Sequence, residues 1–320
     1  MPPRRRDSGW ITLAWLLNLA GLAGIGLVLV LYWMSRPVTA SGTQSQSIVS
    51  AAASLTPLPT IYYLPTVTPN PRSTMIVVES PTPFVLANGT RPAVIGFSVS
   101  GRPIDVYTFG QGEKQRMIVA GIHGGYEWNT IALADELIRH IAAEPELIPG
   151  DVTLYILRNL NPDGDARDHG IEGRVNDHGV DLNRNFPENW EAEWDRDGCW
   201  DYGPTSGGPA AASEPETRAL ISFLRLHKIE ILISYHSAAL GIFPGGEPWD
   251  DDSIRLAEEL DRITTYPFPP IDTGCRYTGT LADYAVSLGA VSVDMELRNH
   301  RDMDFEMNLN VLDLLLNWEP

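Results

Sequence analysis

Cysteine and positive charge are both scarce in this chain of 320 residues. Its two cysteines, Cys199 and Cys275, cannot form the framework of several disulfides on which small secreted domains rely, and the sequence leaves open whether they pair. Lysine and arginine total 23 against 41 aspartates and glutamates, which gives a formal charge of −18 at pH 7. A strongly acidic chain repels nucleic acid, so this class of partner is excluded. No protein partner can be inferred.

The N-terminal part differs in composition from the rest. Three arginines at positions 4–6 lie in a basic tail, residues 1–9, and an apolar run follows from residue 10 to 34 with aromatic side chains at its ends. About 20 apolar residues span a bilayer, and arginines stay on the cytoplasmic side. We therefore expect a single-pass signal anchor at 10–34 that binds the lipid bilayer, with a cytoplasmic tail and the remainder outside the cell membrane. The alternative is a cleaved signal peptide, with Val38-Thr39-Ala40 as the cleavage site and a secreted product.

Residues 35–90 are rich in serine, threonine and proline, with eight prolines between positions 37 and 90. Such a segment buries too little apolar surface to offset the entropy of ordering, so it is expected to be a flexible, disordered stalk. Residues 1–36 carry a net charge of +3 and residues 37–90 none, so residues 91–320 carry −21. These 230 residues are long enough to form one folded domain with a substantial core.

Apolar patterning in residues 91–320 alternates between short buried runs and helical periodicity. Such alternation is typical of an α/β fold whose mixed, mostly parallel sheet is flanked by helices on both faces. The predicted strands are residues 117–122, 152–157, 229–234 and 291–295, and the predicted helices cover residues 131–141, a segment from 213 onward and residues 305–318.

Two local signals punctuate this pattern. Asn161-Pro-Asp-Gly164 is a strong turn signal after the strand at 152–157. Ser213-Glu-Pro-Glu216 resembles a capping box, in which Ser213 would be the N-cap and Glu216 would reach back to it. We expect a turn at the first segment and a helix start at the second.

Four chemically active side chains fall close to strand ends. His123 and Glu127 follow the first predicted strand, His236 follows the third, and Glu296 follows the fourth. Ligands of parallel α/β sheets bind beyond the carboxyl ends of the strands, so these side chains are expected to meet. Two histidines and one carboxylate can hold one Zn²⁺ and leave a position for water. Glu296 would then remain free as the base that takes a proton from that water.

Several motifs occur in a fixed order along the domain. A segment at residues 95–104 with Phe109-Gly110 comes first, and NPDG at 161–164 and GVDLNRNFP at 179–187 follow. SEPET at 213–217 and Glu296-Leu-Arg298 come last. In this order the chain resembles the zinc metallocarboxypeptidase family, with likeness to both carboxypeptidase A and the murein peptide amidases, over most of residues 94–320. The resemblance implies that His123, Glu127 and His236 hold the zinc ion and that Glu296 is general base and acid.

The resemblance implies further roles around the metal. Arg174 would stabilise the oxyanion of the tetrahedral intermediate. Asn183 and Arg184 would bind the terminal carboxylate of the substrate. Tyr277 would be the tyrosine that covers the bound substrate. Asp283 would lie near the pocket for the terminal side chain and, if it faces inward, would favour an amine-bearing residue.

The first metal motif departs from the family pattern. Three residues, Gly124, Gly125 and Tyr126, separate His123 from Glu127, where the family has two. In a helical turn positions i and i+4 still share a face, and the two glycines would also allow a bulge that restores the geometry. Alternatively Glu127 is displaced and the metal site is weak or lost.

These features predict a membrane-anchored extracytoplasmic zinc metallopeptidase, a hydrolase that removes C-terminal residues from peptides. The compact domain is similar to murein peptide amidases, so cell-wall (murein) peptides, including those linked to diaminopimelate, are expected substrates. Two alternatives remain: an N-acyl amino acid deacylase of the aspartoacylase type, whose family shares an Asp-x-Asn-Arg segment, and a non-catalytic tethered peptide-binding domain.

Overall fold

The computed structural model describes residues 91–192, 206–239, 241–272, 274 and 277–320. The predicted tail, membrane span and stalk, residues 1–9, 10–34 and 35–90, lie outside the described residues, as do Cys199 and Cys275. None of the described helices is both long and apolar enough to cross a membrane.

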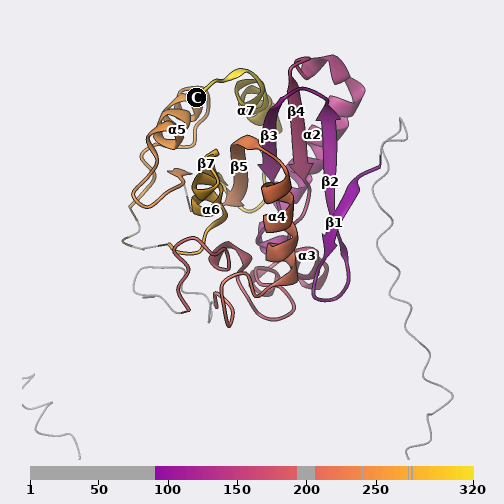
Figure 1. The fold of residues 1–320 in the computed structure, drawn as a ribbon, viewed down its shortest axis with the longest axis vertical. Coiled ribbons are helices and arrows are strands. Elements are labelled where there is room, and N and C mark those ends of the chain that lie inside the picture. Colours follow the sequence, from indigo (N-terminus) through magenta and orange to yellow (C-terminus); the bar gives the residue numbers. More distant parts are fainter. Residues whose placement is uncertain (1–90, 193–205, 240, 273, 275–276) are drawn as a thin grey trace, which may run out of the picture. The chain divides into compact units, whose positions relative to one another are not determined.

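Seven strands form one mixed sheet (Figure 1), in the order β1-β2-β4-β3-β5-β7-β6. The four central strands, β4, β3, β5 and β7, run parallel, and antiparallel strands flank them on either side. The strand bounds are β1 Ala93–Phe97, β2 Pro103–Gly110, β3 Lys114–Val119, β4 Val152–Leu157, β5 Ile229–Ser237, β6 Ile242–Pro244 and β7 Val291–Leu297.

The sheet is covered on both faces by helices. The core on one face joins strand residues to α2 (Trp128–Ala143), α5 (Asp251–Ile263) and α7 (Phe305–Asn317). The core on the other face joins them to α4 (Pro215–Leu226) and α6 (Leu281–Ser287). Neighbouring residues of β3 illustrate the alternation, because Met117 belongs to the second core and Ile118 to the first. The predicted α/β architecture is confirmed for the described domain.

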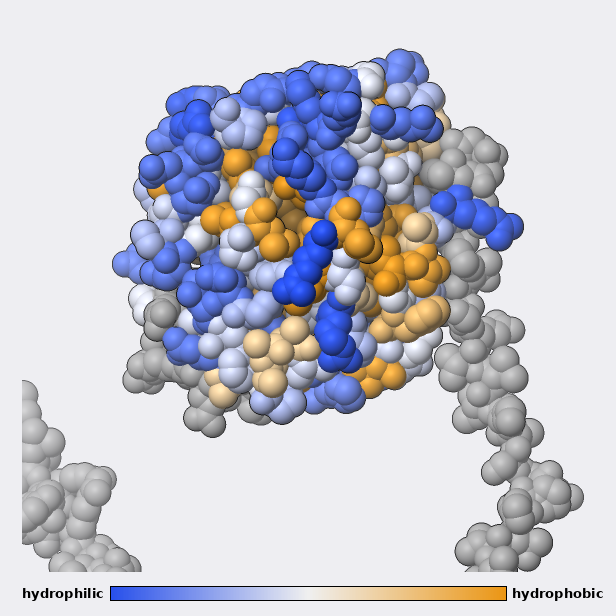
Figure 2. Space-filling view, in the orientation of Figure 1, coloured by the Kyte–Doolittle hydropathy of each residue, from blue (hydrophilic) through white to orange (hydrophobic). Residues whose placement is uncertain are grey.

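The surface over α4 is mostly polar. Figure 2 shows hydrophilic groups around an apolar area near the centre of this face. At the C-terminal end of α4, Leu226 is 83% exposed. Single exposed leucines are normal on soluble proteins, so this residue marks no site by itself.

The helix start predicted at residues 213–216 is confirmed, since α4 begins at Pro215, but its capping and the predicted turn at NPDG differ from the prediction. The NPDG segment begins a short helix, α3 (Pro162–Arg167), because the Asn161 side chain caps it by accepting a hydrogen bond from the Gly164 N–H. Helix α4 has Glu214 at its N-cap rather than Ser213. The Ser213 hydroxyl donates to the Glu214 carboxylate, and Glu216 accepts from the Val99 N–H of the loop after β1. The predicted capping box is therefore wrong, because both of its members bond elsewhere.

The carboxyl ends of β3, β5 and β7 bring the predicted site residues to one edge of the sheet. A 3₁₀ turn, η1 (Gly124–Glu127), follows β3 and leads into α2. His236 and Glu296 lie inside the last residues of β5 and β7 rather than after them, so both strands are longer than predicted.

Candidate metal centre and substrate pocket

Three buried side chains converge on one point at the sheet edge. His123 Nδ1 lies 2.7 Å from Glu127 Oε1, and His236 Nδ1 lies 3.2 Å from both His123 Nδ1 and Glu127 Oε2. The three donor atoms lie within 4.8 Å of one another. Two imidazole nitrogens and a carboxylate are suitable zinc donors, and their mutual distances allow one ion to reach all three. This is the zinc site of the protein.

The extra residue in the first metal motif is accommodated by the two glycines. Gly124 has φ +46°, and a Cβ on Gly125 would lie 2.1 Å from the backbone oxygen of Asp168. Close approach of this backbone lets the η1 turn carry Glu127 back to His123 as an i, i+4 pair. The displaced-Glu127 alternative is therefore not what the structure shows.

Asp181 contacts both the metal ligand His123 and Arg174. Its Oδ1 lies 3.0 Å from His123 Nε2, and its Oδ2 accepts a hydrogen bond from Arg174 Nε at 3.0 Å. Burial alone would raise the pKa of Asp181, but Arg174 and His123 hold it well below its ordinary value. Asp181 was not singled out from the sequence. The signal was present, because metal-binding histidines usually donate their other N–H to a carboxylate and Asp181 stands two residues before Asn183.

Glu296 lies beside the metal ligands without joining them. The register of β5 and β7 pairs His236 with Glu296, and the Ala239 N–H donates to Glu296 Oε2 at 2.9 Å. Burial, with Glu127 nearby, raises the pKa of Glu296 to about 7, although the charge of His236 opposes the rise. The same neighbourhood lowers the pKa of Glu127, because His123 and His236 outweigh the effect of its burial. The lowered pKa keeps Glu127 ionised, as a metal ligand must be. The raised pKa of Glu296 suits a group that takes up and releases a proton.

Arg174 points its guanidinium group at the same centre. Its Nη1 lies 3.2 Å from His123 Nδ1 and 3.4 Å from Glu127 Oε1. Burial of Arg174 against Asp181 fixes this position. A fixed cation here faces the space where negative charge would develop on a substrate bound at the metal.

Asn183 and Arg184 lie further along the cavity, in the 3₁₀ turn η4 (Leu182–Arg184). The Asn183 Oδ1 accepts a hydrogen bond from the Leu281 N–H, and Arg184 Nη1 donates to the Asn183 carbonyl oxygen at 2.7 Å. Burial lowers the pKa of Arg184, although Asp181 opposes the effect. The Arg184 guanidinium carbon lies 4.9 Å from the centre of the Tyr277 ring, so the structure brings both residues together.

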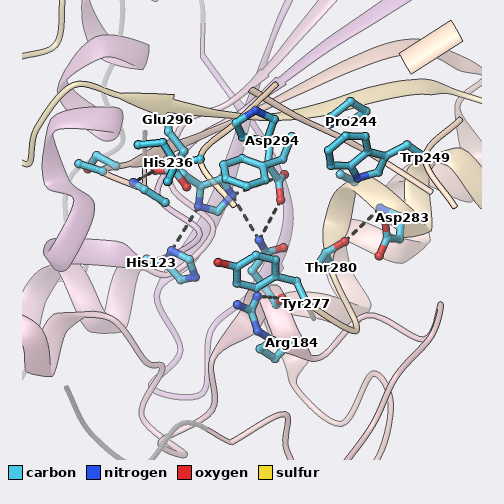
Figure 3. A pocket seen from close by; sticks show the side chains of 18 of the residues that line it. His123, Arg184, His236, Pro244, Trp249, Tyr277, Thr280, Asp283, Asp294 and Glu296 are labelled. Atoms are coloured by element: carbon cyan, nitrogen blue, oxygen red, sulfur yellow. Dashed lines mark hydrogen bonds and ion pairs between the residues drawn. The ribbon is translucent and has the colours of Figure 1, made fainter. Parts of the chain in front are cut away.

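These residues line one cavity of about 1310 Å³. Figure 3 shows His123, His236 and Glu296 at one end, Trp249 and Asp283 at the other, and Arg184, Tyr277 and Asp294 between them. The cavity exceeds the ~300–1,000 Å³ of ordinary small-molecule pockets, so it has room for several residues of a peptide.

The far end of the cavity contains a buried carboxyl group. Asp283 lines the cavity and accepts a hydrogen bond from the Gly246 N–H at 2.8 Å. Burial raises the pKa of Asp283. Asp283 therefore faces the cavity, which is the position in which the sequence predicts a preference for an amine-bearing residue.

Two residues of the cavity wall were not assigned from the sequence. The rings of Tyr126 and His300 are 4.5 Å apart, and both line the cavity near Arg174. Burial lowers the pKa of His300. His300 follows β7 in a loop, and no spacing in the sequence connects it with Tyr126.

Comparison with known proteins agrees with this geometry. The sequence profile of the zinc carboxypeptidase family matches residues 87–313. Murein peptide amidase A of Vibrio campbellii is 28% identical over 228 residues, covering 66% of this chain and 84% of that protein. Gamma-D-glutamyl-L-diamino acid endopeptidase 1 of Lysinibacillus sphaericus is 28% identical over 225 residues, covering 58% of this chain and 54% of that protein.

Among solved structures, murein-tripeptide amidase of Escherichia coli O157 superimposes with a TM-score of 0.55 at 23% identity, covering 71% of this chain and 92% of that one. The first curated relatives are longer proteins, of which this chain spans about half or less, for example 11% of rat carboxypeptidase D. The family profile nevertheless covers most of the chain and includes all three metal-binding side chains. This chain belongs to the zinc carboxypeptidase family.

Proposed function

We propose that this hydrolase removes single residues from the C-terminus of peptides. The observation that carries the proposal is the shared cavity of the metal centre, the Glu296 carboxyl group and the buried Asn183–Arg184 pair. An arginine buried beside an asparagine suits a substrate carboxylate, because the guanidinium fork binds it through two hydrogen bonds. Recognition of a free carboxylate at this place directs cleavage to the terminal peptide bond.

The side chains divide the chemistry between them. Bound zinc would acidify a water molecule and polarise the carbonyl group of the scissile bond. Glu296 takes a proton from the water and passes it to the leaving amine, for which its raised pKa is well suited. Arg174 stabilises the negative charge that develops on the carbonyl oxygen. Tyr277 packs against Arg184 and covers the bound terminal residue.

Cell-wall peptides are the proposed substrate class. Two relatives are named for action on murein peptides or diamino acid links. Within this chain, Asp283 places a carboxyl group at the end of the cavity that would receive the terminal side chain. A buried carboxyl group gains most from a cationic partner, so it favours an amine-bearing residue such as diaminopimelate or lysine.

The experiment is mass spectrometry of a peptide and muropeptide pool incubated with the zinc-loaded full chain, with and without a chelator. The proposal expects chelator-sensitive loss of single C-terminal residues, fastest when that residue bears a side-chain amine. The same peptides with amidated C-termini serve as the matched control and should stay intact.

Other results would support the alternatives. Hydrolysis of N-acyl amino acids, with peptides left intact, would assign the chain to the deacylases. Binding of free C-termini without turnover by the zinc-loaded chain would indicate a tethered binding domain.

We also propose that residues 10–34 anchor the enzyme in the cell membrane with the domain outside. The support is the basic tail and apolar run of the sequence. Extraction of cell membranes with alkaline carbonate should leave the full chain in the membrane fraction. Release of a shorter chain that begins near Ala40 would instead establish secretion after cleavage.

A further inference from the structure

The register of β5 and β7 sets two pairs of polar residues side by side. Ser234 pairs with Asp294, and two residues further His236 pairs with Glu296. Side chains two apart on a strand point to the same face, so all four are directed toward one side of the sheet. Two of them are the metal ligand His236 and the proposed base Glu296. The other pair, Ser234 and Asp294, has no role in the proposed chemistry.

The carboxylate of Asp294 lies between two groups that do have roles. Its Oδ2 accepts a hydrogen bond from Asn183 Nδ2 at 3.2 Å, and its Oδ1 lies 3.6 Å from His236 Nε2. Oδ1 is buried, and no group of the described residues donates a hydrogen bond to it. Ser234 Oγ also lies near the same histidine nitrogen, at 3.0 Å. A buried carboxylate oxygen needs a donor or a positive partner.

The orientation of Asn183 decides which partner is available. Its Oδ1 accepts from the Leu281 N–H, so the Nδ2 group is the one that faces Asp294 and His236. His236 directs Nδ1 at the metal point, so its proton belongs on Nε2. Two N–H donors, from Asn183 and His236, therefore face the Asp294 carboxylate, with the Ser234 hydroxyl as a second acceptor.

We propose that Asp294, with Ser234, is a positioning residue that holds the metal ligand His236 by its Nε2–H and ties it to Asn183. This arrangement parallels the one on the other histidine, where Asp181 faces His123 Nε2. Each metal histidine thus has its own carboxylate. Because Asp294 also holds Asn183, it couples the metal centre to the site for the substrate carboxylate. The inference concerns metal binding and can be tested whether or not the proposed peptidase activity is found.

The first test measures zinc affinity of the full chain by competition with a chromogenic chelator. The variants are Asp294→Asn, Ser234→Ala and, as a matched control from the same cavity, Asp283→Asn. Loss of the carboxylate behind a metal-bound histidine typically weakens metal binding about 10–100-fold. We expect at least a tenfold loss in Asp294→Asn, a smaller loss in Ser234→Ala and less than a twofold change in Asp283→Asn. Equal affinities of Asp294→Asn and the unchanged chain would overturn the proposal, as would an equal loss in the Asp283→Asn control.

A second measurement reads the protonated ring nitrogen directly in the chain with Asp294 and Ser234 intact. In the zinc-loaded full chain labelled with ¹⁵N-histidine, the His236 resonances report which ring nitrogen carries the proton. They are assigned by their absence in His236→Gln. The proposal expects a proton on Nε2 that exchanges slowly with water, since it is buried and hydrogen-bonded. A proton on Nδ1, or a rapidly exchanging Nε2 proton, would show that Asp294 does not hold this nitrogen. Unchanged zinc affinity with an altered choice of C-terminal residue in Asp294→Asn would place the carboxylate in the substrate pocket instead.

Discussion

His123 Nδ1 lies 2.7 Å from Glu127 Oε1 across a turn that contains one residue more than the family pattern. The contact depends on how closely the backbone of the η1 turn approaches its neighbours. Gly125 is the point of closest approach, since a Cβ there would meet the Asp168 oxygen at 2.1 Å. The glycines of the motif therefore have a physical function: they let a longer turn return Glu127 to the metal point.

The variant Gly125→Ala tests this relationship. The added methyl group must displace η1 or the loop at Asp168, and such overpacking costs about 1–3 kcal/mol of unfolding free energy. Because η1 carries Glu127, we expect zinc affinity to fall at least tenfold. Chelator competition and thermal unfolding of the zinc-loaded chain measure the two effects.

Gly150→Ala is the matched control, since a Cβ at Gly150 has no atom within 4 Å. It should leave zinc affinity unchanged. Normal zinc affinity in Gly125→Ala would mean that the turn can shift without moving Glu127, and would contradict the role given to this glycine.

Arg184→Lys tests recognition of the substrate carboxylate. Lysine keeps the charge but loses the fork that makes two hydrogen bonds. A hydrogen bond to a charged group contributes about 1.5–3 kcal/mol, so KM for peptides with a free C-terminus should rise about 10–100-fold, with a smaller change in kcat. Steady-state kinetics on a peptide with a free C-terminus checks this. An unchanged KM in the variant would mean that Arg184 does not contact the substrate carboxylate.

The pH dependence of kcat/KM should show an acidic limb due to Glu296. The base works only when ionised, and burial raises its pKa from 4.5 to about 7. Bound zinc adds positive charge nearby and favours the ionised form, so we expect the midpoint between 4.5 and about 7. Activity should therefore fall as the pH drops through this window. Bound zinc must be measured at each pH. If kcat/KM falls in parallel with the zinc content, the acidic limb reports loss of the metal and not protonation of Glu296.

Burial on both faces made the central strands predictable. All six residues of β4 are buried, and its predicted bounds, 152–157, agree with the structure. β1 and β2 contain exposed residues and lie at one end of the sheet order, where the apolar signal is weak.

The turn predicted at the NPDG segment was wrong for a different reason. An asparagine followed by proline is compatible with both a turn and a helix cap, and only the contact with the Gly164 N–H decides between them.

The residues of the candidate site likewise fall into those that the sequence could predict and those that it could not. His123, Glu127, His236 and Glu296 could be predicted because each follows or ends a buried strand of the sheet. The residues behind them could not, because their roles depend on register. Asp294 becomes important only when β7 pairs with β5 so that it faces Ser234 and His236. No local pattern in the chain contains that pairing.

The variant Glu296→Gln should lose activity and yet gain stability when the metal is absent. General acid–base catalysis contributes about 10²–10⁴-fold, so kcat/KM should fall by that factor. In the metal-free chain, the pKa of Glu296 is about 7 when folded and near 4.5 when unfolded. The folded state therefore holds the proton more tightly, and ionisation destabilises it as the pH rises from 4.5 to 7.

Each pKa unit corresponds to 1.36 kcal/mol, and Glu296 is partly exposed to water in the cavity, so the gain from the uncharged glutamine should be about 1–3 kcal/mol at pH 8. At pH 4.5 the native carboxyl group is protonated in the folded state and half protonated in the unfolded chain, so the gain should fall below about 0.5 kcal/mol. Urea unfolding of both chains in chelator at pH 4.5 and pH 8 measures it. Zinc-loaded samples provide the control, since the dication stabilises the Glu296 carboxylate and should remove most of the advantage of glutamine. A variant that is no more stable than the native chain at pH 8 without metal would mean that the buried carboxylate is already compensated, and that its pKa lies near 4.5.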